Sequence, residues 1–359
     1  MSRQTEIIIN LKALKHNFQQ VKTFSPNSKI IAMVKANAYG HGLRRVAKAL
    51  CNTDAFGVAC LEEAMVLRQE GLKNKIILME GFFSKKEITE IQEYHCDIVL
   101  HHHEQLDLIL KSRLSFPVTV WLKINTGMNR LGFSPDEVLP IYQQLIASKN
   151  IQKPIRFMTH FSDADNVKNS KTNYQIEEFN RIIAGFSGEH CLANSAGIIG
   201  FDHSHAEWVR PGIMLYGVSP FIDSTAKEFN LHPVMTLKSK LIAVRHQKKG
   251  DAIGYGSAWI CPEDMLVGVV AIGYGDGYPR HAESGTPTLI NNKICPIVGR
   301  VSMDMMSVDL RNCIEAKVGD LVTLWGAGIP VETIAQHAST ISYDLLCGLT
   351  SRVHNVEIM

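Results

Sequence analysis

The chain has 359 residues, of which 45% are hydrophobic, and its formal charge is +2 from 37 basic and 35 acidic residues. This length is enough for one large domain and a smaller second one, and the balanced charge lacks the basic stripe of a nucleic-acid-binding protein. No apolar run approaches the ~20 residues of a membrane-spanning helix, and no apolar secretory segment follows Met1. The eight cysteines are scattered and form no Cys-x-x-Cys pair, so we expect them to lie in the core. Together these features predict a cytoplasmic protein without nucleic-acid or membrane partners.

The first two-thirds of the chain alternate helical and strand-like segments. Apolar residues recur at helical spacing in residues 11–21 and 43–50 and lie on one face of each segment. Eight short apolar runs are typical of strands: residues 30–34, 56–60, 76–79, 98–100, 118–124, 155–159, 190–193 and 208–215. Because each parallel strand needs a crossover helix before the next, this alternation predicts an α/β fold with an N-terminal (β/α)₈ barrel of the TIM type. The alternative, a doubly wound open sheet, would place a Gly-x-Gly-x-x-Gly loop after its first strand, and the sequence has none there.

The remaining third of the chain has a different pattern of apolar and turn-forming residues. From Leu231 onward, short alternating strands are separated by Gly and Asp turns such as Lys249-Gly250-Asp251 and Val318-Gly319-Asp320. This pattern predicts a C-terminal mainly-β domain at residues 231–359, with one helix near residues 331–337, after a barrel domain at residues 1–230.

Lys35 ends the first predicted barrel strand and is followed by an Asn, Tyr and Gly-rich loop. An isolated lysine at a strand end is ordinarily a solvated residue that prevents edge pairing. In a barrel, however, catalytic residues come from the C-terminal ends of the strands, and an unprotonated lysine amine forms Schiff bases with carbonyl compounds. Ser195 and the Gly212-Ile213 backbone follow the seventh and eighth strands, where this fold frequently binds a phosphate.

The sequence around Lys35, V-K-A-N-A-Y-G-H-G at residues 34–42, resembles the pyridoxal-phosphate motif of the bacterial alanine racemases. Further segments resemble the same family in the same order: W-L-K-I-N-T-G-M-N-R-L-G at 121–132, W-V-R-P-G-I at 208–213, I-G-Y-G-S-A-W at 253–259 and V-S-M-D at 301–304. The resemblance implies racemisation of L-alanine and D-alanine, supplying D-alanine for peptidoglycan. It also implies pyridoxal 5'-phosphate as cofactor, bound as a Schiff base to Lys35, and two catalytic bases. Lys35 would serve the face of D-alanine and Tyr255 that of L-alanine.

The resemblance also assigns roles to other side chains. Residues expected to bind the cofactor are Lys35, Tyr39, His160, Asn194, Ser195, Arg210, Gly212, Ile213 and Tyr343. Arg210 would face the pyridine nitrogen, where a guanidinium can only donate and the nitrogen stays unprotonated, and His160 would stack on the ring or orient Arg210. Arg130 would bind the cofactor's phenolate oxygen and the substrate carboxylate, near Lys123, which carries a carbamate in some relatives. Met303 and Tyr274 would complete the substrate site.

The resemblance also implies a quaternary structure in which two subunits share each active site. Relatives are head-to-tail dimers, so we expect a homodimer in which Tyr255, Met303 and Tyr274 reach the site of the partner subunit, and we expect the strand at residues 7–9 to join the C-terminal sheet. Two alternatives stay open: a non-catalytic regulatory protein that carries the same cofactor, and an amino-acid decarboxylase of the same fold type. No metal is expected, because the contiguous histidines at residues 101–103 cannot converge on one ion.

Overall fold

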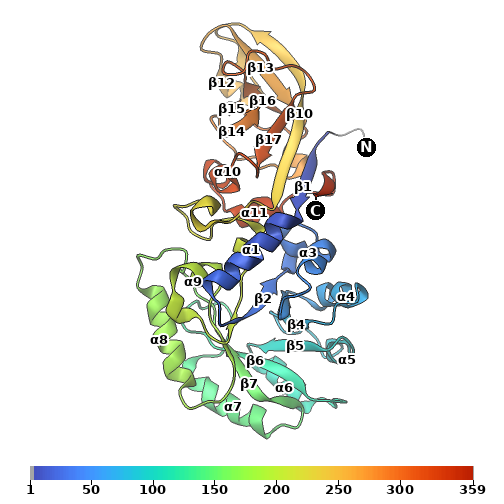
Figure 1. The fold of residues 1–359 in the computed structure, drawn as a ribbon, viewed down its shortest axis with the longest axis vertical. Coiled ribbons are helices and arrows are strands. Elements are labelled where there is room, and N and C mark those ends of the chain that lie inside the picture. The colour runs from blue at the N-terminus through green and yellow to red at the C-terminus, as the bar shows by residue number, and fades with distance from the viewer. Residues whose placement is uncertain (1–3, 359) are drawn as a thin grey trace.

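The computed structural model describes residues 4–358, and in it a closed barrel and an eight-stranded sheet lie end to end (Figure 1). The barrel consists of β2 (Lys29–Met33), β3 (Ala55–Val58), β4 (Lys75–Leu78), β5 (Cys96–Leu100), β6 (Val118–Lys123), β7 (Ile151–Met158), β8 (His190–Cys191) and β9 (Trp208–Val209). All neighbouring barrel strands are parallel, and β9 closes the barrel on β2. The predicted fold class is therefore confirmed.

The barrel strands are apolar on both faces because helices cover the outside and packed side chains fill the inside. The whole of β3 and of β5 is buried, for example. The covering helices are α1 (Leu11–Phe24), α3 (Leu43–Ala49), α4 (Leu61–Gln69), α5 (Glu87–Glu93), α6 (His103–Lys111), α7 (Val138–Ala147), α8 (Lys171–Ile183) and α9 (Ser195–Gly200). The helical spacing in residues 11–21 and 43–50 thus corresponds to α1 and α3, most of whose apolar residues are buried.

The last two barrel strands are shorter than predicted, and β8 contains only the first two residues of the strand expected at 190–193. We expected a strand through residues 208–215, but β9 ends at Val209, and Ile213–Tyr216 forms a 3-10 helix. Pro211 has no N–H to continue a strand ladder, and the backbone turns at Gly212. The apolar run is instead explained by packing, because all four residues of the 3-10 helix are buried.

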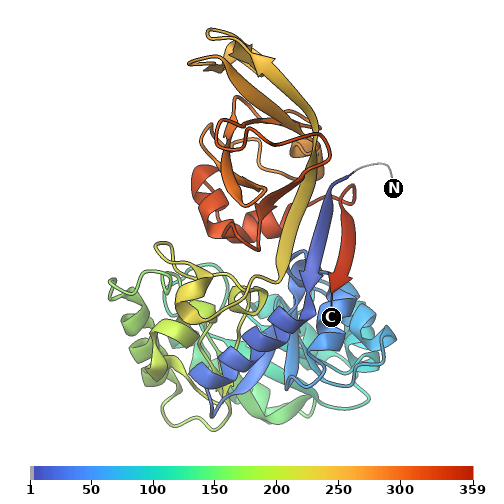
Figure 2. The same ribbon diagram turned by 45° about the horizontal axis from the view of Figure 1, so that its top comes forward.

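The second sheet contains strands from both ends of the chain (Figure 2). Its order is β13 (Met265–Val270), β16 (Met306–Asp309), β15 (Lys293–Val298), β14 (Pro287–Ile290), β17 (Leu321–Trp325), β10 (Met235–Gln247), β1 (Glu6–Asn10) and β18 (His354–Ile358). Here β1 pairs antiparallel with β10 and parallel with β18. A small hairpin of β11 (Ala252–Ile253) and β12 (Trp259–Ile260) projects from this part of the chain.

Two helices accompany the sheet, whereas one was predicted. The predicted helix is α10 (Val331–His337), and α11 (Ser342–Cys347) follows it. None of the helices among residues 4–358 is long and apolar enough to span a bilayer. The expectation for the cysteines was partly wrong: five are buried, but Cys51 and Cys347 are exposed and Cys60 is intermediate, and none of the eight forms a disulfide.

Candidate active site

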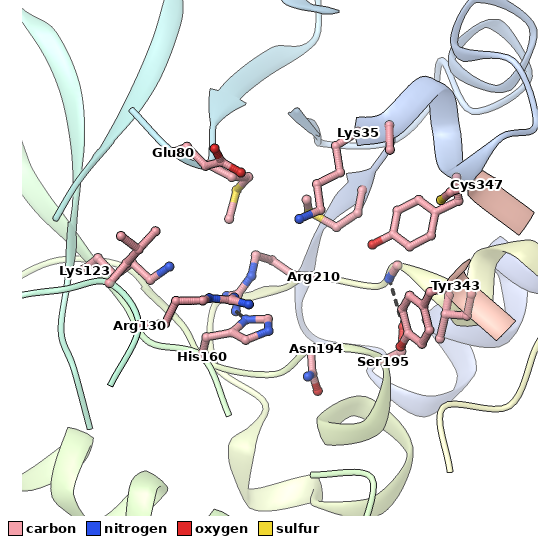
Figure 3. A pocket seen from close by; sticks show the side chains of 17 residues that line it. Lys35, Glu80, Lys123, Arg130, His160, Asn194, Ser195, Arg210, Tyr343 and Cys347 are labelled. Atoms are coloured by element: carbon pink, nitrogen blue, oxygen red, sulfur yellow. Dashed lines mark hydrogen bonds between the residues drawn. The ribbon is translucent and has the colours of Figure 1, made fainter. Parts of the chain in front are cut away.

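A cavity of about 570 Å³ opens where the C-terminal ends of the barrel strands meet (Figure 3). Ten of the predicted site residues line it: Lys35, Tyr39, Arg130, His160, Asn194, Ser195, Arg210, Gly212, Ile213 and Tyr343. Lys35 extends into the middle, with Glu80, Lys123 and Arg130 on one side and Ser195 and Tyr343 on the other. The volume is within the range of roughly 300–1,000 Å³ that small-molecule and cofactor sites occupy.

Lys35 begins a short left-handed turn, α2 (Lys35–Tyr39). Ala36, Asn37, Ala38 and Tyr39 all have positive φ, between 52° and 55°. Left-handed backbone costs about 1–2 kcal/mol for each L-residue and rarely persists over consecutive residues, and such strain is concentrated at functional sites. The turn is thus a conformation that its surroundings must stabilise, and it lies directly between the predicted Schiff-base lysine and Tyr39.

The end of the turn fits closely against the C-terminal helix α11. Gly40 has φ of 79°, and a side chain there would collide with the carbonyl of Leu346. The Tyr39 ring stacks on Tyr216 with centroids 4.8 Å apart and lies 6.0 Å from the ring of Tyr343. Burial and the nearby Tyr343 raise the pKa of Tyr39, so that its hydroxyl stays protonated and can donate a hydrogen bond.

Arg210 is buried beside His160. Its terminal nitrogens donate to the carbonyls of Cys191 (3.1 Å) and Thr159 (2.8 Å) and to Nδ1 of His160 (3.1 Å). Since the guanidinium can only donate, His160 must accept through Nδ1 and carry its proton on Nε2. Burial and the charge of Arg210 hold the pKa of His160 well below its ordinary value, so the imidazole is neutral. Within the described chain, Nε of Arg210 has no hydrogen-bond acceptor from the protein, although the guanidinium lines the cavity.

Opposite Arg130, the cavity is lined by hydroxyl groups and closely approaching backbone. Asn194 caps α9 by accepting a hydrogen bond from the N–H of Gly197 (2.9 Å). The hydroxyl oxygen of Ser195 accepts from the N–H groups of Gly212 (2.9 Å) and Met214 (3.3 Å). A Cβ on Gly212 would lie only 2.6 Å from the hydroxyl of Tyr39, so a side chain would fill this corner. Hydroxyls and backbone N–H groups at a glycine suit a phosphate.

The loop that carries Arg130 is folded by a local side-chain network. Oδ1 of Asn125 accepts from the N–H groups of Gly127 (3.1 Å) and Asn129 (3.0 Å), and Nδ2 of Asn125 donates to Oδ1 of Asn129 (3.0 Å). Asn129 has φ of 57°, a conformation that Asn tolerates better than most residues. The Asn-Thr-Gly-Met-Asn segment therefore forms the compact loop that positions Arg130 over the barrel.

The cavity has an excess of basic side chains. Lys35, Lys123, Arg130 and Arg210 line it, whereas Glu80 is the only carboxylate among the described lining residues. Burial, followed by the charges of Arg210 and Arg130, lowers the pKa of Lys123 from its ordinary 10.5 to about 8. Such a site favours a ligand with several negative charges. The donor set therefore fits pyridoxal 5'-phosphate together with an amino-acid carboxylate: hydroxyls and backbone N–H groups for the phosphate, an arginine donor for the ring and a lysine amine for the aldehyde.

Three predicted residues lie outside this cavity. Tyr255, Tyr274 and Met303 belong to the C-terminal domain and are 68%, 40% and 53% exposed. Tyr274 and Met303 are neighbours, because the N–H of Tyr274 donates to the carbonyl of Ser302 (3.0 Å). Tyr255 lies in a 3-10 turn between β11 and β12. The structure of one chain thus separates the two predicted bases.

Lys123, which the resemblance placed near Arg130, also lines the cavity, and six further lining residues were not predicted: Met33, Ala36, Met79, Glu80, Leu131 and Cys347. Met79 and Glu80 could have been found, because they follow the third barrel strand as Lys35 follows the first. Cys347 carried no such signal. It reaches the cavity from α11, a helix that belongs to the C-terminal domain and packs against the left-handed turn.

Comparison with known proteins identifies the relatives of the whole chain. The family model described as "Alanine racemase, N-terminal domain" matches residues 9–220, and "Alanine racemase, C-terminal domain" matches residues 234–357. An alanine racemase of Coxiella burnetii is 50% identical over the full length of both chains, and one of Shewanella piezotolerans is 51% identical over 96% of each. The crystal structure of the biosynthetic alanine racemase of Pseudomonas aeruginosa superposes with a TM-score of 0.97 at 39% identity, covering 99% of this chain and 100% of that one. The structure of the alanine racemase from Acinetobacter baumannii superposes with a TM-score of 0.95, also at 39% identity and with the same coverage.

Proposed function

The chain belongs to the alanine racemase family, and we propose that it interconverts L-alanine and D-alanine with pyridoxal 5'-phosphate as the cofactor attached to Lys35. One observation carries this proposal beyond family membership. The barrel cavity holds Lys35 between an arginine-rich side that suits a carboxylate and a hydroxyl-lined side that suits a phosphate. A cofactor with an aldehyde and a phosphate, combined with an amino acid, matches this distribution of groups.

The residues on each side of Lys35 have distinct tasks. Ser195, Tyr343 and the backbone of Gly212 and Ile213 bind the phosphate, next to Asn194 and the hydroxyl of Tyr39. Arg210 would donate from Nε to the ring nitrogen of the cofactor, and neutral His160 holds the guanidinium by accepting from one of its terminal nitrogens (3.1 Å). Because arginine does not give up a proton, a ring nitrogen bound there would stay unprotonated, which would disfavour transamination and suit the return of a proton to Cα.

The substrate is held by groups on the opposite side. Arg130 binds its carboxylate through a planar, bidentate guanidinium. When bound, the cofactor withdraws electrons from the amino acid and so acidifies the Cα–H bond. Lys35 removes or delivers the Cα proton on the D-alanine face. The L-alanine face requires a second base, which is Tyr255.

Tyr255 acts from the partner subunit of a homodimer. Within one chain it is exposed and is absent from the residues that line the cavity. A head-to-tail dimer brings Tyr255, Tyr274 and Met303 of one subunit to the barrel mouth of the other, where the backbone N–H of Met303 contacts the carboxylate. The division of the chain at residues 230 and 231 then separates the barrel, which provides most of the cofactor site, from the domain that adds Tyr343 to that site and completes the site of the partner. The eight unpaired cysteines favour a reducing cytoplasm, where D-alanine supplies peptidoglycan synthesis.

The decisive experiment combines an assay with a chemical trap. Purified protein with pyridoxal 5'-phosphate is expected to convert L-alanine into D-alanine, measured with an enantiomer-specific oxidase. Borohydride reduction and peptide mapping should place a pyridoxyl group on Lys35 and on no other lysine. Lys35→Ala should lose both signals, whereas Lys48→Ala, which changes an exposed lysine of α3, should keep both. Release of carbon dioxide would instead indicate a decarboxylase, and cofactor binding without turnover would indicate a regulatory protein.

A further inference from the structure

His41 lies two residues after Tyr39 and is fully buried, although no step of the proposed reaction uses it. Its Nδ1 lies 2.8 Å from the carbonyl oxygen of Tyr39 and 3.1 Å from that of Ala38. Because both partners can only accept, Nδ1 carries the proton and donates to both carbonyls. We propose that His41 is a positioning residue that stabilises the left-handed turn and so directs Lys35 and Tyr39 into one cavity. This inference rests on the proposed function, in which Lys35 carries the cofactor.

The turn requires stabilisation from outside its own backbone. Backbone hydrogen bonds run from the N–H of Ala38 to Val34 (2.8 Å), of Gly40 to Ala36 (3.0 Å), of His41 to Ala38 (3.0 Å) and of Gly42 to Asn37 (2.9 Å). Consecutive left-handed L-residues are nevertheless disfavoured by contact between each Cβ and the following carbonyl. The two carbonyls that His41 binds belong to Ala38 and Tyr39, the last left-handed residues before Gly40, so the imidazole fixes the peptide planes near the end of the turn.

The imidazole also connects the turn to the barrel strand before it. The ring of Tyr216 lies 4.5 Å from that of His41 and 4.8 Å from that of Tyr39. The Tyr216 hydroxyl donates to the carbonyl of Met33 (2.8 Å), the last residue of β2. These rings therefore form one buried cluster that spans the turn, with Lys35 between its two attachment points.

His41 performs this task in a single protonation state. Burial lowers its pKa to about 4, so the ring is neutral at pH 7. Its Nε2 is buried and has no hydrogen-bond partner among residues 4–358. The hydrogen bonds of the imidazole are thus made by Nδ1 alone. A substitution that removes or displaces this single donor therefore tests its role.

The experiment compares four variants with the unaltered chain. His41→Leu removes the donor, and His41→Asn retains an N–H donor at the position of Nδ1. His41→Gln keeps a polar group but places its donor one atom farther from the backbone. The matched control is Asn150→Ala, because Asn150 is buried and donates to the carbonyls of Ile109 (2.9 Å) and Ser112 (2.8 Å), outside the cavity.

The first measurement is the dissociation constant for pyridoxal 5'-phosphate, with borohydride trapping on Lys35. Loss of a buried hydrogen bond is expected to weaken binding roughly tenfold in His41→Leu and His41→Gln, while His41→Asn stays close to the unaltered chain. Asn150→Ala should lower the melting temperature without changing the dissociation constant. Equal weakening in Asn150→Ala, or no rescue by His41→Asn, would show that His41 contributes only general stability. If His41→Leu does not fold, the dissociation constants of His41→Asn and His41→Gln still distinguish a positioning role from general stability.

The second measurement needs no cofactor. Amide hydrogen exchange of the protein without pyridoxal phosphate should be roughly tenfold faster at Gly40 and Gly42 in His41→Leu or His41→Gln, but not in His41→Asn or Asn150→Ala. Unchanged exchange at both glycines would overturn the inference. If the unaltered chain failed to trap the cofactor on Lys35, the proposed function would be wrong, and the exchange rates would still decide whether His41 stabilises the turn.

Discussion

Two inactive variants, Lys35→Ala and Tyr255→Ala, should restore activity to each other when they share a dimer. Lys35 lines the barrel cavity, whereas Tyr255 is 68% exposed in the other domain of the same chain. In a mixed dimer, one site combines the intact Lys35 of one chain with the intact Tyr255 of the other, and the second site carries both lesions. If equal amounts pair at random, about half of the dimers are mixed and roughly a quarter of all sites are intact.

The assay is racemisation after co-refolding of the two variants. Two different affinity tags allow mixed dimers to be isolated, and these should have about half the activity per site of the unaltered enzyme. Each variant refolded alone is the control, and neither should recover activity. Isolated mixed dimers that remain inactive would refute the shared site, because both residues would then have to come from one chain, while cofactor attachment to Lys35 would be unaffected.

Three further outcomes are expected. Tyr255→Phe should reduce solvent-deuterium exchange into L-alanine by roughly 10²- to 10⁴-fold and exchange into D-alanine much less; equal losses would mean that Tyr255 only positions the substrate. Lys123→Met should stabilise the protein without cofactor at pH 7, in bicarbonate-free buffer, by up to about 3 kcal/mol, because burial lowers the pKa of Lys123 from 10.5 to about 8 in the folded state. Between pH 8 and pH 10.5 the folded chain therefore holds fewer protons than the unfolded chain, so the unaltered protein gains stability as the pH rises. In denaturant titrations the stability advantage of the variant should vanish near pH 10.5. A stability difference that does not depend on pH would argue against the lowered pKa of Lys123. Arg156→Met should lower the free energy of unfolding by about 3–5 kcal/mol, because Arg156 forms ion pairs with Asp97 (2.8 Å) and Glu189 (2.9 Å). The kcat/KM measured below the melting temperature should not change, because these ion pairs lie at the opposite end of the barrel from the cavity.

The sequence by itself determined the architecture, because barrel strands and covering helices leave local periodic patterns. Six of the eight predicted strands overlap barrel strands over most of their length, the seventh shares only residues 190 and 191 with β8, and the eighth was too long where Pro211 and Gly212 end the ladder. The resemblance to the alanine racemases assigned Arg130, His160 and Arg210, and these residues line one cavity with Lys35 because the closed barrel gathers all strand ends into one place.

Tertiary structure decided what depends on residues that are distant in sequence. The left-handed backbone after Lys35 has no local signature, since Ala and Tyr do not favour positive φ, and it exists because His41, Tyr216 and α11 surround it. The presence of Cys347 in the cavity depends likewise on how α11 packs against the barrel. The distance between Tyr255 and the cavity follows from the arrangement of the two domains. Sequence periodicity contains no information on that arrangement, because it indicates only which face of a helix or strand is buried.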